Sequence, residues 1–145
     1  MNEECLFKAI DLMFQSPSHS ITMEFQGGEP SLPFLLLQKA VERAVELNEK
    51  YKKQITYVLC TNSVNLTEEI LCLCKEYNIL ISTSLDGPAF IHNHNRGKTD
   101  SYKRVIEGIS KARNYLGTDR VSALMTTSEL SLNYPKEIID NYLSN

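Results

Sequence analysis

Phe25-Gln26-Gly27-Gly28-Glu29-Pro30 says more about the fold than any other stretch of this 145-residue chain. It follows residues 21–25, whose alternation of apolar and polar side chains is typical of a β-strand, and it precedes a long amphipathic segment. Two glycines at a strand end let the backbone turn sharply and approach a ligand closely, because neither carries a Cβ. The glutamate beside them supplies a carboxylate that accepts hydrogen bonds from an amino group. We therefore expect a binding loop suited to the ammonium end of an amino-acid-like ligand rather than to a phosphate.

Strand-like and helical periods alternate along the rest of the chain. The pattern predicts strands over residues 21–26, 55–60, 79–84 and 121–126. It predicts helices over residues 3–15, 33–51, 67–77, 101–116 and 136–142. Thr67 is the expected cap of the third helix, and Gly117 is expected to end the fourth.

Strands that alternate with helices form a parallel sheet through right-handed crossovers. About four strands cannot close a barrel, since a complete (β/α)8 barrel takes about 250 residues. The sequence therefore predicts an α/β fold in one domain over residues 1–145. Two architectures fit the pattern: an open doubly wound sheet, or part of a larger barrel.

Unusual residue clusters follow the carboxyl ends of all four expected strands. They occupy residues 26–30, 61–63, 84–88 and 126–127. Active sites of parallel α/β folds lie at this edge of the sheet. We therefore expect the four clusters to contribute to one ligand site.

Composition excludes several classes of partner. The net charge is −3 and the basic residues form no stripe, so nucleic acid is not expected as a ligand. No apolar run reaches the roughly 20 residues that span a bilayer, so no membrane association is expected. Residues 1–4 lack the basic region of a signal peptide, and a cytoplasmic location is therefore expected.

No metal site is expected from the sequence. The four cysteines are Cys5, Cys60, Cys72 and Cys74. Cys72 and Cys74 lie two residues apart in an expected helix, where such positions point to different faces. Cys60 ends a strand and could face a ligand, but a packed position in the core is expected. His92 and His94 lie in an expected polar loop, residues 92–100, which favours exposed or loop-capping side chains.

Three of the clusters, in this order, resemble the radical S-adenosylmethionine (SAM) enzymes, in particular the anaerobic sulfatase-maturating enzymes and related peptide maturases. They read Gln26-Gly27-Gly28-Glu29-Pro30, Thr61-Asn62-Ser63, and Ser84-Leu85-Asp86-Gly87-Pro88 with His92 and Arg96. Residues 15–18, 82–88 and 122–127 are most similar to the radical SAM maturase of the His-Xaa-Ser peptide system. The resemblance covers essentially the whole chain and departs at Ser63, where the family has glycine.

The resemblance implies a SAM site. Its expected residues are Gly27, Gly28, Glu29, Asn62, Ser84 and Arg96. The glycine loop and its glutamate would hold the methionyl ammonium, and Asn62 would support the cofactor or the facing loop. Ser84 and Arg96 would meet the methionyl carboxylate and the nearby ribose, since an arginine fork suits a carboxylate.

The resemblance also implies a peptide or protein substrate. Gln26 and Asp86 lie where the substrate of the family approaches, and Thr126 and Thr127 would line the same cavity. In the family, a four-iron, four-sulfur cluster cleaves SAM reductively, and the 5′-deoxyadenosyl radical takes a hydrogen atom from the substrate. The protein contributes binding, orientation and shielding.

The family signature Cys-x3-Cys-x2-Cys, whose thiolates bind the cluster, does not occur in this sequence. We therefore expect part of a radical SAM barrel without the N-terminal cluster loop or the C-terminal portion. No cluster and no catalytic residue are expected in this chain, which alone is expected to be inactive. Exposed sheet edges would then favour self-association.

Two other functions stay open. One is a non-catalytic remnant or binding module that retains a SAM- or peptide-binding surface. The other is an unrelated α/β nucleotide-binding domain, which the absence of a glycine-rich phosphate loop disfavours.

Overall fold

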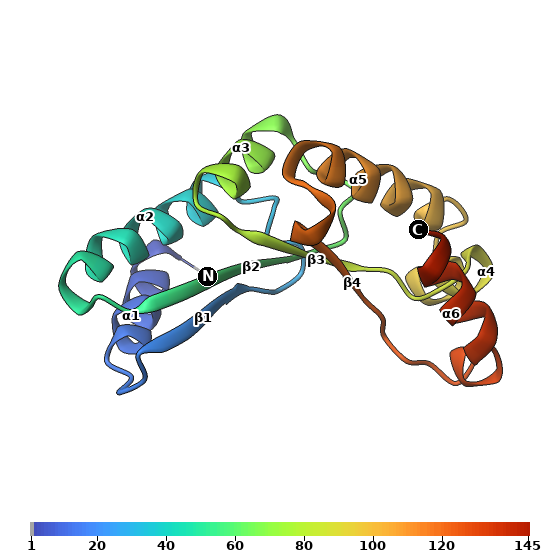
Figure 1. The fold of residues 1–145 in the computed structure, drawn as a ribbon, viewed down its shortest axis with the longest axis horizontal. Coiled ribbons are helices and arrows are strands. Elements are labelled where there is room, and N and C mark those ends of the chain that lie inside the picture. Colours follow the sequence, from blue (N-terminus) through green and yellow to red (C-terminus); the bar gives the residue numbers. More distant parts are fainter. Residues whose placement is uncertain (1) are drawn as a thin grey trace.

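A computed structural model describes residues 2–145, which form a four-stranded parallel sheet with helices between the strands (Figure 1). The strands are β1 (Ser20–Phe25), β2 (Gln54–Thr61), β3 (Leu80–Ser84) and β4 (Val121–Leu124). The α-helices are α1 (Glu3–Phe14), α2 (Phe34–Tyr51), α3 (Glu68–Glu76), α4 (Ala89–Arg96), α5 (Ser101–Leu116) and α6 (Pro135–Ser144), and two short 3-10 helices are η1 (Thr118–Arg120) and η2 (Ser131–Asn133). The strand order is β1-β2-β3-β4 with every pair parallel, which confirms the predicted α/β class.

Helices cover one face of the sheet. Figure 1 shows α2, α3 and α5 together on the same side of the four strands. Met23, Leu59 and Ile81 are buried on this side, whereas Thr22 and Glu24 point to the opposite face and are exposed. A doubly wound sheet carries helices on both faces, so the single covered face favours the partial-barrel alternative.

Two predicted helix boundaries are confirmed by their caps. The Thr67 side chain accepts a hydrogen bond from Ile70 N and begins α3. Gly117 follows α5 with a φ of +102°, a conformation that favours glycine. These local signals act within one turn of the chain, which is why the sequence alone located them.

The helix α4 was not predicted, because its residues 92–96 read as a polar loop. Pro88 precedes it as N-cap, and Gly97 ends it in the left-handed conformation. Tertiary burial stabilises this helix of eight residues, since Ile91 and His92 are 0% and 3% exposed. The expectation of an exposed His92 was therefore wrong.

The loop after β2 adopts its shape although Ser63 replaces the glycine of the family. Ser63 has a φ of +57°, in the left-handed region, and is buried. Its hydroxyl lies 2.6 Å from the hydroxyl of Thr83 on β3, so a hydrogen bond offsets the conformational cost. The backbone of α5 approaches closely here, since a Cβ added to Gly108 would lie 1.9 Å from the Ser63 carbonyl oxygen.

The outer strands of the sheet are β1 and β4. Self-association through these edges stays a prediction. No helix within residues 2–145 combines the length and the apolar character needed to cross a bilayer.

Candidate functional site

A cavity of about 530 Å³ opens at the carboxyl ends of β1, β2 and β3. Its volume falls in the range of small-molecule sites, roughly 300–1,000 Å³. All six residues expected to bind a cofactor line it: Gly27, Gly28, Glu29, Asn62, Ser84 and Arg96. Gln26, expected to face a substrate, lines it as well. The clusters that follow three separate strands thus meet in one space.

The glycine loop borders this cavity with its backbone. Gly27 has a φ of +144°, which an L side chain rarely adopts. A Cβ added at Gly27 or Gly28 would meet no atom within 4 Å, so the space beside both glycines is open. A ligand can therefore reach the main-chain atoms of this loop directly.

The Glu29 carboxylate joins the glycine loop to the end of β2. Its Oε1 accepts hydrogen bonds from Ser31 Oγ at 2.7 Å, Ser31 N at 3.2 Å and Thr61 Oγ1 at 2.7 Å. Its Oε2 accepts from Asn62 N at 2.9 Å. A carboxylate oxygen has two lone pairs, so Oε2 retains capacity for one further donor. Glu29 thus fixes two loops and can still receive an ammonium.

Asn62 shapes its own loop. Its side-chain Oδ1 accepts a hydrogen bond from Val64 N at 2.9 Å, while its main-chain N–H donates to Glu29. The Asn62 side chain is thereby fixed at the wall of the cavity. This geometry suits the supporting role that was expected for it.

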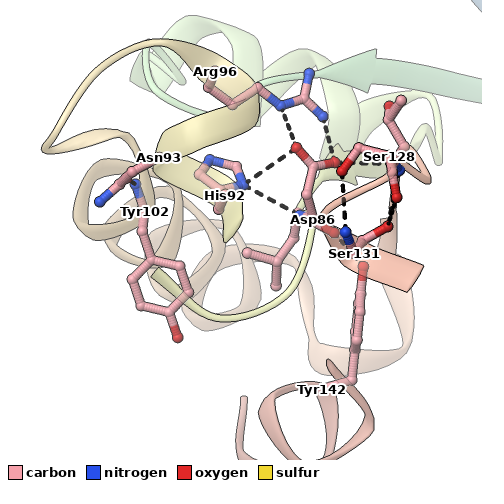
Figure 2. A network of polar contacts seen from close by, with 10 residues as sticks. Asp86, His92, Asn93, Arg96, Tyr102, Ser128, Ser131 and Tyr142 are labelled. Carbon is pink, nitrogen blue, oxygen red and sulfur yellow. Dashed lines mark hydrogen bonds and ion pairs between the residues drawn. The ribbon is translucent and has the colours of Figure 1, made fainter. Parts of the chain in front are cut away.

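Arg96 extends from the end of α4 to the cavity wall and is held by a buried carboxylate (Figure 2). Arg96 Nε donates to Asp86 Oδ2 and Nη2 to Asp86 Oδ1, both at 2.7 Å. The Arg96 side chain is 33% exposed, whereas that of Asp86 is fully buried. Ser84 lies at the end of β3, two residues before Asp86, and faces the cavity.

His92 completes this network as a neutral side chain. Its Nδ1 accepts a hydrogen bond from Asp86 N at 3.2 Å, which requires the proton to reside on Nε2. Burial lowers the pKa of His92, and the Asp86 carboxylate opposes this shift. The histidine therefore supports the main chain of Asp86 and does not act as a cation.

Three residues expected to face a substrate lie outside the cavity wall. Asp86 is buried behind it. Thr126 and Thr127 follow β4 with exposed side chains, and Thr126 N donates to Asp86 Oδ1 at 2.9 Å. Their contact with a substrate stays a prediction.

The cavity also contains charged residues that sequence reasoning missed. Lys98 and Arg104 line it on the side of α5, and they read as ordinary surface charges in the sequence. Cys60 was expected in the core, and this was wrong, because it is half-buried and lines the cavity from β2. Its thiol donates to Glu24 Oε1 at 2.9 Å. Burial, followed by the neighbouring Glu24, raises the pKa of Cys60 to about 11, so this thiol is protonated at neutral pH. The alternation of side chains along β1 could have revealed the contact between Glu24 and Cys60, since it puts Glu24 on the same face as Gln26, which lines the cavity.

The cysteines of the described chain lie apart. Cys74 is buried in α3, while Cys72 of the same helix is exposed and lies 3.0 Å from the Tyr115 hydroxyl. Cys5 is exposed on α1. Within residues 2–145, no three His, Cys, Asp or Glu side chains gather closely enough to hold a metal ion. The thiols present here do not fit an iron–sulfur cluster, which needs several thiolates in one place.

Comparison with known proteins relates the chain to one superfamily. The family described as "Radical SAM superfamily" matches residues 7–140. An uncharacterized protein of Methanothermobacter thermautotrophicus is 30% identical over 146 residues, covering 100% of this chain and 54% of that protein. A serine-type anaerobic sulfatase-maturating enzyme of Bacteroides thetaiotaomicron is 29% identical over 141 residues, covering 93% of this chain and 33% of the enzyme.

Solved structures share the fold. Native anSMEcpe with bound AdoMet (SAM) superposes with a TM-score of 0.80 at 22% identity, covering 99% of this chain and 40% of that chain. Native anSMEcpe with bound AdoMet and the Kp18Cys peptide gives a TM-score of 0.77. The chain therefore spans between one third and about half of the length of these relatives.

Proposed function

Because the chain belongs to the radical SAM superfamily, we propose that its cavity binds S-adenosylmethionine by the methionyl end. The observation that supports this is the distribution of charge within one cavity. Glu29, held against the end of β2, provides an anionic group, and Arg96 at the end of α4 with Lys98 provides cationic groups. A zwitterionic amino-acid group complements this arrangement at both ends.

The residues divide the binding between them. Main-chain carbonyls of Gly27 and Gly28, together with Glu29 Oε2, accept hydrogen bonds from the ammonium. The Ser84 hydroxyl and the Arg96 guanidinium donate to the carboxylate. The open space beside both glycines leaves room for a ligand to approach this closely.

We further propose that the protein takes part in modifying a peptide or protein substrate. The support comes from relatives named anaerobic sulfatase-maturating enzymes and from the neighbour with a bound peptide. In this superfamily, SAM that is reduced by an iron–sulfur cluster supplies a strong hydrogen-atom abstractor. Gln26, which lines the cavity beside the glycine loop, would face this substrate.

A second function is favoured by the separation of the cysteines. Cys5, Cys60 and the two cysteines of α3 do not gather in one place, so residues 2–145 hold no donor set for a cluster. Binding of SAM or of a peptide without radical chemistry fits this observation. Both functions share the cavity, and they differ only in whether a cluster can be supplied.

Isothermal titration calorimetry of the chain with SAM tests the shared step. We expect saturable binding, and we expect Glu29→Gln to weaken it about 10- to 150-fold, since a hydrogen bond to a charged group contributes roughly 1.5–3 kcal/mol. Glu49→Gln, an exposed position of α2 outside the cavity, is the matched control and should bind as the unaltered chain does. Melting curves of both variants separate lost affinity from lost folding.

The proposal fails if the folded chain gives no binding at millimolar SAM. It also fails if Glu29→Gln and Glu49→Gln bind equally well.

A further inference from the structure

Asp86 is a fully buried carboxylate that is separated from the cavity by two residues of its wall, Arg96 and His92. Figure 2 shows it between Arg96 on one side and His92 on the other. Its side chain has no exposed surface and does not line the cavity, although Arg96 does.

The hydrogen bonds of Asp86 are all internal. Oδ1 accepts from Arg96 Nη2 and from Thr126 N, and Oδ2 accepts from Arg96 Nε. The main-chain N–H of Asp86 is also used, because it donates to His92. Exposing this carboxylate to a ligand would break the pair with Arg96, and an uncompensated buried charge costs several kcal/mol. Direct contact between Asp86 and a ligand is therefore disfavoured.

The same contacts fix the orientation of Arg96. A guanidinium is planar, and two of its nitrogens on one edge are bound to the carboxylate. The donors on the remaining edges keep a set direction while the side chain stays one-third exposed at the cavity. A long side chain held in this way loses less conformational freedom when a ligand binds than a mobile one would.

We propose that Asp86 is a positioning residue, which presents the Arg96 fork to the carboxylate of a ligand in the cavity and ties the loop after β4 to the same fork through Thr126. The inference rests on the proposed function, because that function supplies the ligand. It assigns to Asp86 an indirect role, in place of the direct substrate contact that the sequence suggested.

Calorimetry with two ligands tests the proposal on the full chain. The ligands are SAM and decarboxylated SAM, which lacks only the methionyl carboxylate. Asp86→Asn keeps the size of the side chain, but its amide NH2 opposes an N–H of Arg96, so the fork loses its fixed direction. We expect this variant to weaken SAM binding about 10-fold and to leave the affinity for decarboxylated SAM unchanged. Asp119→Asn, an exposed aspartate in η1, is the matched control.

A double-mutant cycle shows whether Asp86 acts through Arg96. In an Arg96→Gln background, Asp86→Asn should change the SAM affinity less than twofold. Equal loss of both ligands in Asp86→Asn, or an undiminished effect without Arg96, would overturn the proposal. If SAM binds and the two substitutions are additive, the inference fails while the proposed function stands. If the unaltered folded chain binds neither ligand, both fail.

A spectroscopic measurement on the unaltered chain covers the case in which Asp86→Asn does not fold. The Arg96 side-chain Nε–H should give a slowly exchanging NMR signal, because it donates to a buried carboxylate. The signals of its other donors should shift on addition of SAM and stay in place with decarboxylated SAM. A fast-exchanging Nε–H, or identical shifts with both ligands, would contradict the proposal.

Discussion

Replacing Gly108 by alanine tests how closely α5 approaches the loop after β2. The added Cβ would lie 1.9 Å from the carbonyl oxygen and 2.8 Å from the carbonyl carbon of Ser63. Both are main-chain atoms of a buried residue with a left-handed backbone, so neither can rotate away. Either α5 or the loop must shift.

The magnitude follows from two opposing effects. Overpacking of this kind costs about 1–3 kcal/mol, and a contact with main-chain atoms belongs at the upper end. Alanine in place of glycine inside a helix returns about 1 kcal/mol. The net loss of about 2 kcal/mol in the free energy of unfolding lowers Tm by roughly 4–8 °C for a domain of this size.

Thermal and urea unfolding, followed by circular dichroism, measure this loss. Ser110→Ala, at an exposed position of the same helix, is the control and should leave Tm unchanged or slightly higher. Because the displaced loop contains Asn62, Gly108→Ala should also weaken SAM binding. A Tm equal to or above that of the unaltered chain would refute the reasoning, since it would mean that the close approach does not exist in solution.

Three further predictions concern His92 and the cysteines. Burial lowers the pKa of His92 below its ordinary value of 6.5. The contribution of neutral His92 to stability is therefore present above pH 6.5 and is lost as the pH falls through the lower pKa of the folded state. Between pH 7 and pH 4, Tm should fall less steeply in His92→Gln than in the unaltered chain, and parallel curves would contradict this. Burial raises the pKa of Cys74 to about 12, whereas a thiol in the unfolded chain titrates near its ordinary value of 9. Stability should therefore decline as the pH rises above 9, and Cys74→Ala should make this decline of Tm with pH less steep. In the native state a thiol reagent should modify the exposed Cys5 and Cys72 and spare Cys74 until the protein unfolds, and rapid modification of Cys74 would count against its burial.

The regular elements and most of the cavity could be predicted because they depend on local patterns. Period and caps located the strands and five of the helices, and position after a strand brought Gln26, Glu29 and Ser84 to one edge of the sheet. The helix α4 was not predicted, because most of its residues are polar and its buried side, Ile91 and His92, depends on tertiary packing. The pairing of Asp86 with Arg96 likewise depends on how α4 packs, which no spacing along the chain reveals.

Side chains along each strand alternate between the two faces of the sheet, so odd-numbered and even-numbered positions have different roles. Odd-numbered residues such as Met23, Leu59 and Ile81 are buried under the helices, and even-numbered ones such as Glu24 and Cys60 face the uncovered side. The register keeps this parity across the sheet, since Cys60 pairs with Ser82 and Ser82 with Ser122. A mutational library restricted to the even positions would therefore sample new recognition surfaces on an unchanged core, whereas the same effort at odd positions would yield mostly misfolded protein.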